Sequence, residues 1–202
     1  MNSACVIGNG PSRLQFDLNK IAETMKTYGC NALYRDYMPD YLISMDYNMV
    51  KEILDNKVHY RTSFHTQHEN RIDKLQSEGE PINFFWGFSE TNDSGNSALK
   101  LALQHNNDVV YMIGFDYSSN PSVLPNVYSG SKNYVSRHSY PAASMLDSKW
   151  EQRLKKIIKQ HPDKKVVRVN GTRSLIIGNE NYSEISTNYF KEIYERTIRI
   201  QI

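Results

Sequence analysis

Short apolar runs and amphipathic stretches alternate along the chain, and each kind has its own period. The apolar runs predict strands over about 4–7, 29–33, 41–46, 58–62, 82–86, 109–115 and 166–169. Apolar positions at three-to-four spacing predict helices over about 18–25, 49–54, 94–103, 143–159 and 184–196. Residues 65–80 are polar and predict a surface helix or loop. This alternation is typical of a Rossmann-like α/β fold, an open, mostly parallel sheet with helices on both faces.

The segment 117–143 interrupts the alternation. It is rich in Ser, Asn, Pro, Gly and Tyr, has no sustained period, and is longer than the usual connection in a compact domain. Loops of this length are typically functional lids or disordered, so we predict a lid-like segment here. The chain shows no internal repeat and no linker, and we expect a single domain over residues 1–202.

Composition excludes several classes of protein. The 24 basic and 22 acidic side chains leave a net charge of +2, too little to drive nonspecific binding to nucleic acid or membranes. No apolar run approaches the roughly 18 to 20 residues that cross a bilayer. The N-terminus lacks the features of a secretion signal, so we expect a cytoplasmic protein without a membrane span.

Cysteine and histidine spacing predicts no resident metal. Cys5 and Cys30 fall in predicted core strands without CxxC spacing, and we interpret both as small buried hydrophobic residues. His59, His65 and His68 have suggestive spacing, but no acidic or cysteine partner completes a zinc site.

A glycine-containing loop follows the first predicted strand and precedes the first predicted helix. It contains Gly8, Asn9, Gly10 and Ser12. Glycines let the backbone approach a ligand closely, and unpaired amides at a helix start favour an anion. The loop matches neither the GxGxxG fingerprint nor the GxxxxGK[ST] loop. We interpret it as a candidate phosphate cradle, with an ordinary tight turn as the alternative.

Further candidate residues fall at predicted strand ends or helix starts. They are Asn31, Asp46, Ser94, Gly95, Gly114 and Asp116. Because ligands bind outside the carboxyl ends of parallel strands, we expect these residues beside the glycine loop. Asparagine can hydrogen-bond a base or ribose, and a carboxylate at a strand tip can accept from ribose hydroxyls or hold a divalent ion such as Mg²⁺. Each residue alone is also typical of a cap or turn, and Ser94 is a candidate N-cap.

These residues, in this order, resemble the family 42 sialyltransferases of bacterial surface-glycan synthesis. The resemblance rests on residues 8–12, 30–31, 93–95 and 113–117, and it covers about the first 120 residues. In that family the glycine loop and an asparagine bind the nucleotide of a CMP-sugar. Two lid tyrosines hold the leaving phosphate, and a histidine acts as the base.

The resemblance implies a set of nucleotide contacts in this chain. They are Gly8, Asn9, Gly10, Ser12, Asn31, Ser94, Gly95, Gly114 and Asp116, and we add the strand-end Asp46 and Tyr117 as candidate contacts beside them. The lid-like segment also offers Tyr117, Tyr128 and Tyr134 as donors to a phosphate, and Arg137 as a cation for its charge. His138 is the candidate base because imidazole titrates near neutral pH. A surface histidine beside a solvated arginine is the alternative.

A second resemblance is to pyrophosphokinases similar to archaeal hydroxymethylpterin diphosphokinase. It rests on residues 8–12, 39–43 and the strand-end Asp46, and it implies binding of Mg²⁺ and ATP, with Asp46 and Asp116 as the acidic groups. Lysine and arginine clamps for a triphosphate are not evident near the glycine loop. A nucleotide-binding module without catalysis is a third hypothesis.

The stretch from Lys149 to Arg168 is the most basic part of the chain, with eight basic and two acidic residues. It is either the solvated face of an amphipathic helix or a docking surface for a polyanion such as DNA. We predict a glycosyltransferase that moves a sugar from a CMP- or UDP-type donor to a hydroxyl of a glycan or of a hydroxylated, flipped-out DNA base. The expected reaction is one displacement without an essential metal, although Mg²⁺ remains an option.

Overall fold

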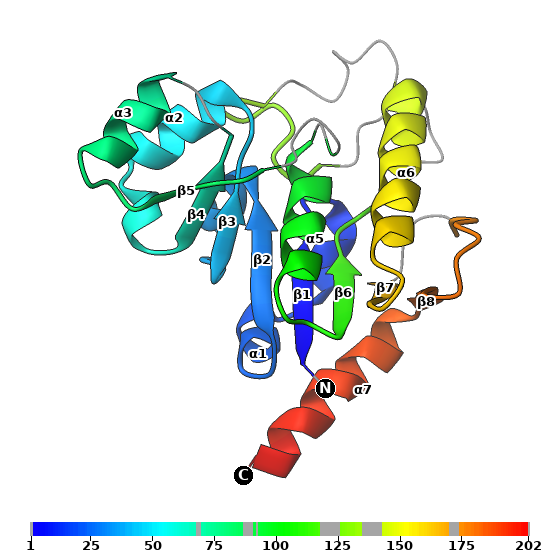
Figure 1. Ribbon diagram of the computed structural model, residues 1–202. Helices are drawn as coiled ribbons and strands as arrows, with labels where there is room; N and C mark the ends of the chain where they lie inside the picture. The colour runs from blue at the N-terminus through cyan, green and yellow to red at the C-terminus, as the bar shows by residue number, and fades with distance from the viewer. Residues whose placement is uncertain are drawn as a thin grey trace.

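One parallel sheet of eight strands organises the computed structural model, which describes residues 2–67, 70–86, 91, 93–117, 126–134, 143–169 and 174–201 (Figure 1). The strands are β1 (Ser3–Ile7), β2 (Lys26–Cys30), β3 (Tyr41–Ile43), β4 (Ser63–Thr66), β5 (Ile82–Phe84), β6 (Val109–Ile113), β7 (Lys165–Val169) and β8 (Tyr182–Ile185). Their order in the sheet is β5-β4-β3-β2-β1-β6-β7-β8, and each neighbouring pair is parallel. The predicted open α/β sheet is confirmed.

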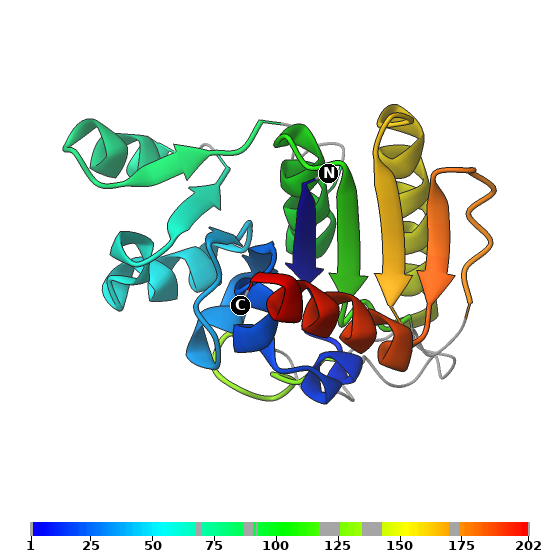
Figure 2. The same ribbon diagram turned by 90° about the horizontal axis from the view of Figure 1, so that it is seen from below.

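Helices cover both faces of the sheet. The α-helices are α1 (Leu18–Ala22), α2 (Tyr47–Asp55), α3 (Asn70–Ser77), α5 (Ser94–Gln104), α6 (Ala143–Gln160) and α7 (Thr187–Gln201). Three short 3-10 helices are η1 (Pro11–Gln15), η2 (Asn31–Arg35) and η3 (Val58–Tyr60). Figure 2 shows α7 in front of the central strands and α5 and α6 behind them. On the α7 side, α2 and α3 pack over the outer strands β3 to β5.

The central strand β1 explains why the apolar runs are unbroken. Ala4 and Val6 belong to the core under α5 and α6, whereas Cys5 and Ile7 belong to the core under α7, and all four are fully buried. A parallel strand covered on both faces needs apolar side chains at successive positions. Cys5 and the buried Cys30 are both free thiols, which confirms their interpretation, and burial raises the pKa of Cys30 to about 12.

Three local predictions were wrong. Residues 58–60 form η3 rather than a strand, because Lys57 turns the chain in the left-handed region (φ 54°), and β4 begins only at Ser63. The second strand lies three residues earlier than predicted and ends where Asn31, also left-handed (φ 51°), starts η2. The edge strand β8 was not predicted at all.

The topology places a crevice at the carboxyl ends of β1 and β6. From β1 the chain builds the sheet outward through β5, and then returns to the other side of β1 as β6. Ligands bind parallel sheets at such a reversal of strand order. Within the described residues, no helix is both long and apolar enough to cross a membrane.

Candidate functional site

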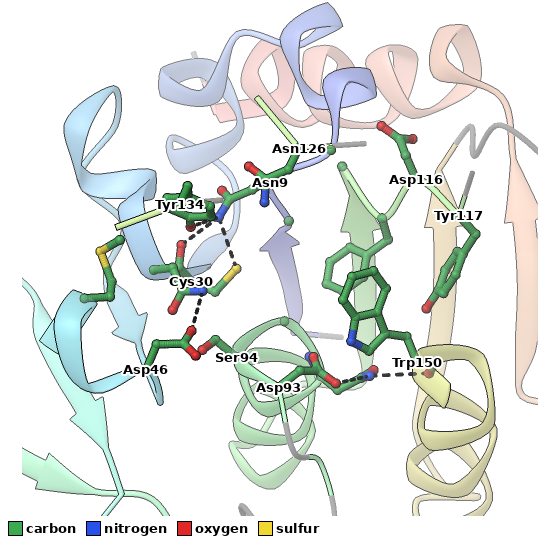
Figure 3. Close-up of a pocket in the computed structure, with 18 of the residues that line it drawn as sticks. Asn9, Cys30, Asp46, Asp93, Ser94, Asp116, Tyr117, Asn126, Tyr134 and Trp150 are labelled. Carbon is green, nitrogen blue, oxygen red and sulfur yellow. Dashed lines mark hydrogen bonds between the residues drawn. The ribbon is translucent and has the colours of Figure 1, made fainter. Parts of the chain in front are cut away.

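A cavity of about 490 Å³ lies at this reversal (Figure 3). It is enclosed by the loops after β1, β2, β3 and β6, the start of α5, the segment 126–134 and one face of α6. The predicted residues that line it are Gly8, Asn9, Gly10, Asn31, Asp46, Ser94, Gly95, Gly114, Asp116, Tyr117 and Tyr134. Ser12 and Tyr128 do not line it, and Arg137 and His138 lie outside the described residues.

The glycines of the β1 loop are needed because the β6 loop passes too close to them for a side chain. A Cβ atom on Gly8 would lie 2.4 Å from the Gly114 carbonyl oxygen, and one on Gly114 would lie 2.5 Å from the Gly8 carbonyl oxygen. A Cβ atom on Gly10 would lie 2.5 Å from Asp116 Oδ2. The two loops therefore cross in van der Waals contact, and any side chain at these positions would separate them.

The amides of the β1 loop are already hydrogen-bonded. Gly8 N donates to the Ile113 carbonyl and Gly10 N to the Gly114 carbonyl, both at 2.8 Å. Ser12 N donates to Asp116 Oδ2 at 2.7 Å, so the Asp116 carboxylate occupies the anion position at the start of η1. The expected phosphate cradle of unpaired amides is therefore not formed by these three groups.

One wall of the cavity comes from the loops after β1, β2 and β3. Asn9 is buried, and its Nδ2 donates to the Cys30 carbonyl (3.2 Å) and the Tyr134 hydroxyl (3.3 Å). Asn31 accepts from Ser44 Oγ (2.9 Å) and donates to Asp46 Oδ2 (3.3 Å). Burial raises the pKa of Asp46, and the hydrogen bond from Asn31 only partly opposes this shift.

The start of α5 forms the floor. Asp93 is the N-cap, one residue before the expected Ser94, and its Oδ1 accepts from Asn96 N at 2.7 Å. Ser94 is buried, and its hydroxyl accepts from Met45 N at 3.1 Å, which joins α5 to the loop after β3. Asp93 Oδ2 accepts from Asn96 Nδ2 at 2.8 Å.

The opposite wall contains Asp116 and Tyr117, which were predicted to lie at the site, and residues of α6, which were not. Figure 3 shows Asp116, Tyr117 and Trp150 on the side facing Tyr134 and Asp46. Lys149, Trp150 and Arg153 of α6 line the cavity, and Arg153 Nη1 lies 3.4 Å from Asp93 Oδ2. The spacing of four between Lys149 and Arg153 places them on one helix face, but the sequence did not show that this face meets the sheet edge.

The described part of the lid-like segment, 126–134, is bound to the body of the protein. Tyr128 is buried, donates to Asp36 Oδ2 (2.6 Å) and accepts from Arg13 Nη2 (2.7 Å), so its hydroxyl is used away from the cavity. Tyr134 lies at the cavity, and burial raises the pKa of its hydroxyl. Of the three tyrosines proposed as phosphate donors, Tyr117 and Tyr134 line the cavity and Tyr128 does not.

Three buried oxygen atoms around the cavity lack a hydrogen-bond partner within the described part of the chain. They are Asn9 Oδ1, Asn96 Oδ1 and Asp116 Oδ1. Buried polar atoms in proteins are almost always hydrogen-bonded, and leaving one unpaired costs about 1–3 kcal/mol. These three atoms belong to residues that line the cavity, but each is covered by neighbouring atoms, so they are not in themselves contacts for a ligand.

Not every residue of the basic stretch lies at the surface. Arg168 is fully buried in β7, where its Nη1 donates to Glu184 Oε1 at 2.8 Å and its Nε to the Phe115 carbonyl at 3.1 Å. Lys155 pairs with Glu151 at 3.1 Å, while Arg153 faces the cavity. The prediction that Arg168 contributes to a polyanion surface is therefore wrong, because a β8 carboxylate neutralises it in the core.

Metal binding is not favoured by the carboxylates. Asp46 and Asp116 stand on different walls, and no cluster of three or more His, Cys, Asp or Glu side chains suited to a metal occurs among the described residues. His59 pairs instead with Glu80 at 2.8 Å. Dependence on Mg²⁺ stays an open prediction for experiment.

Comparison with known proteins gives one informative structural similarity. The chain is similar to a crystal structure of a variant of the sialyltransferase CST-II in complex with CMP, with a TM-score of 0.51 and 14% sequence identity. The match covers 83% of this chain and 80% of that one. No family model matches the chain, and no curated protein is similar to it in sequence. The chain thus has a sialyltransferase-like fold.

Proposed function

We propose that this protein is a glycosyltransferase that takes a sugar from a CMP-type donor and transfers it to a hydroxyl group. The observation that carries the proposal is the cavity of about 490 Å³ at the carboxyl ends of β1 and β6, lined by amide and carboxylate side chains such as those of Asn9, Asn31 and Asp46. The shared fold with a sialyltransferase solved with CMP supports the choice of nucleotide.

A pyrimidine nucleoside suits this cavity in size and in hydrogen-bonding groups. Ligand pockets commonly have volumes of about 300–1,000 Å³, and this one measures about 490 Å³. The two ribose hydroxyls and the exocyclic amino group of cytosine are donors that match acceptor oxygens. Uracil offers a ring N–H in place of the amino group, so a UDP-type donor is the second choice.

The proposed reaction is a single displacement. The acceptor oxygen bonds to the anomeric carbon, the bond from that carbon to the phosphate oxygen breaks, and CMP leaves with the bonding electrons. The Tyr134 hydroxyl stays protonated because burial raises its pKa, so it can donate to the leaving phosphate. His138 remains our candidate for the base that takes the acceptor proton, with Arg137 beside it.

Calorimetric titration with CMP, UMP, UDP, AMP and ATP, in EDTA and again in Mg²⁺, tests the binding step. We expect CMP to bind most tightly and without metal. Asn9→Ala should weaken CMP binding about tenfold, because it removes an amide that lines the cavity and the contact to Tyr134. Asn19→Ala, at an exposed position in α1, is the control and should leave affinity unchanged. Absence of binding by every pyrimidine nucleotide would overturn the proposal.

Turnover is tested with CMP-sugars and a panel of glycan and hydroxylated-DNA acceptors. His138→Ala should lower the transfer rate by a factor of about 100 or more while CMP still binds. Unchanged transfer would exclude His138 as the base. Binding with no transfer to any acceptor would favour a non-catalytic nucleotide-binding module, and a response only to ATP with Mg²⁺ would favour the pyrophosphokinase.

A further inference from the structure

Charge around the cavity presents a problem for a phosphate ligand. Three carboxylates line it, those of Asp46, Asp93 and Asp116. Burial raises the pKa of Asp46 and Asp93, but neither group adds positive charge to the cavity. A leaving phosphate carries growing negative charge in a displacement, and it needs cations or strong donors near it.

The β1 loop does not supply those donors. Its amides at Gly8, Gly10 and Ser12 are bound to the β6 strand end and its loop, the last of them to a carboxylate. A phosphate placed there would have to displace Asp116 and would meet its charge. In this protein the Asp116 carboxylate therefore occupies the usual anion site at the first loop of a doubly wound fold.

The positively charged side chains at the cavity come from α6 instead. Lys149 and Arg153 line the cavity, and they are the only Lys or Arg side chains that do so among the described residues. They are four residues apart and so share one face of the helix. Arg153 Nη1 lies 3.4 Å from Asp93 Oδ2, and Asp93 is itself fixed by two contacts from Asn96. This chain of contacts holds the guanidinium beside the start of α5.

We propose that Lys149 and Arg153 form the phosphate subsite of the donor pocket. This inference rests on the proposed function and adds to it which residues meet the charge of the nucleotide. With Tyr134 on the opposite wall, the phosphate lies between a neutral phenol donor and two α6 cations.

Comparing cytidine with CMP isolates the phosphate contribution to affinity. Lys149→Ala should weaken CMP binding about tenfold and change cytidine binding by less than about twofold, because only CMP has the charge that Lys149 meets. The wild-type preference for CMP should also fall as salt concentration rises. Lys159→Ala removes the same charge from an exposed position of the same helix, outside the cavity, and should change neither affinity.

Arg153 needs a variant that respects its contact with Asp93. Arg153→Ala leaves a buried carboxylate without its cation and can weaken the start of α5, so Arg153→Lys is the paired variant. We expect Arg153→Ala to lose CMP affinity selectively and Arg153→Lys to recover part of it, with circular dichroism confirming the fold of both.

The outcomes separate this inference from the proposed function. If CMP binds the wild type and keeps its affinity in both alanine variants, or if cytidine and CMP weaken equally, the α6 subsite is overturned while the proposed function stands. If neither CMP nor cytidine binds the wild type, the proposed function fails and the subsite fails with it.

Discussion

Gly114 shows how a single residue determines the shape of the cavity. Its φ of +70° lies in the left-handed region, and its backbone crosses that of Gly8 so closely that a Cβ atom has no room. The turn after it brings Asp116 to the Ser12 amide and Tyr117 to the cavity wall. Glycine at this position therefore serves the contact between two loops before it serves any ligand.

Gly114→Ala should destabilise the protein by more than the cost of placing an alanine in the left-handed conformation. A left-handed alanine costs about 1–2 kcal/mol, and we expect the clash with the Gly8 carbonyl to add at least about 2 kcal/mol. Gly178→Ala is the control, because its φ is +74° and nothing lies within 4 Å of its Cβ position. Urea unfolding measures both free energies. Equal losses would contradict the account of crossing loops.

The segment 126–134 is held by a network of charges on η2 and α2. Arg35 donates to Glu52 Oε1 through Nη2 (2.6 Å) and Nε (3.0 Å), and also to Ser131 Oγ (2.9 Å). Asn133 Nδ2 donates to Glu52 Oε2 at 2.6 Å, and Tyr34 donates to Oε1 of the same carboxylate. This network fixes the segment that presents Tyr134 to Asn9.

Glu52→Gln should destabilise the protein in a pH-dependent way. Burial on its own would raise the pKa of Glu52, but hydrogen bonds from Tyr34, Arg35 and Asn133 lower it below the ordinary 4.5. The ionised carboxylate therefore stabilises the fold above pH 4.5, and this contribution is lost as pH falls through the lower folded-state pKa. We expect a loss of about 2–3 kcal/mol at pH 7 that shrinks below pH 4.

Urea unfolding of wild type and variant at pH 7, 4 and 3 measures this dependence. Asp55→Asn breaks an exposed pair with Lys51 on the same helix and should cost at most about 0.5 kcal/mol. A Glu52→Gln penalty that is the same at all three pH values would show that the charge of Glu52 does not hold the segment.

At the scale of the whole molecule, Arg168 joins the second half of the sheet to the site. It is buried in β7, bonds to Glu184 of β8 and to the Phe115 carbonyl, and lies 5.1 Å from the centre of the Tyr117 ring. Glu184 also accepts from Tyr182 (2.6 Å) and from Leu175 N (2.9 Å). The loop after β6 is thus supported from β7 and β8.

Arg168→Leu should lower the free energy of unfolding by about 3–5 kcal/mol, because it leaves Glu184 without its cation in the core. Lys165→Leu, at an exposed position of the same strand, should change it by no more than about 0.5 kcal/mol. Chemical denaturation compares the two variants. Similar stabilities would contradict a structural role for the pair of Arg168 and Glu184.

The sequence predicted those features of the fold and the site that depend on the local pattern of residues. Unbroken apolar runs identified the central strands, and glycine and asparagine at strand ends identified most of the cavity lining on the side of β1, β2 and β6. The predictions failed where the environment of a residue depends on a partner far away in the chain. Asp116 occupies the presumed anion position, and Arg168 is buried only because β8, a short polar edge strand, supplies Glu184.

The local sequence pattern also could not predict that α6 approaches the cavity. A helix with spaced lysines and arginines presents a solvated face by default. Only the packing of α6 beside α5 brings Arg153 to Asp93 and Lys149 to the cavity, and this depends on the order of strands in the sheet. The left-handed Lys57, which ended one predicted strand, likewise has no signal in residue type.

The most direct test of the central claim blocks the cavity without disturbing the fold. Gly95 lines the cavity with no unusual φ, and a Cβ atom there meets only ordinary contacts at 3.5 Å. Gly95→Leu should therefore fold with unchanged or higher stability, since glycine weakens helices by about 1 kcal/mol. Calorimetric titration of both proteins with CMP in EDTA decides the question. We predict saturable binding by the wild type and none by Gly95→Leu, and equal binding by both would contradict a nucleotide site in this cavity.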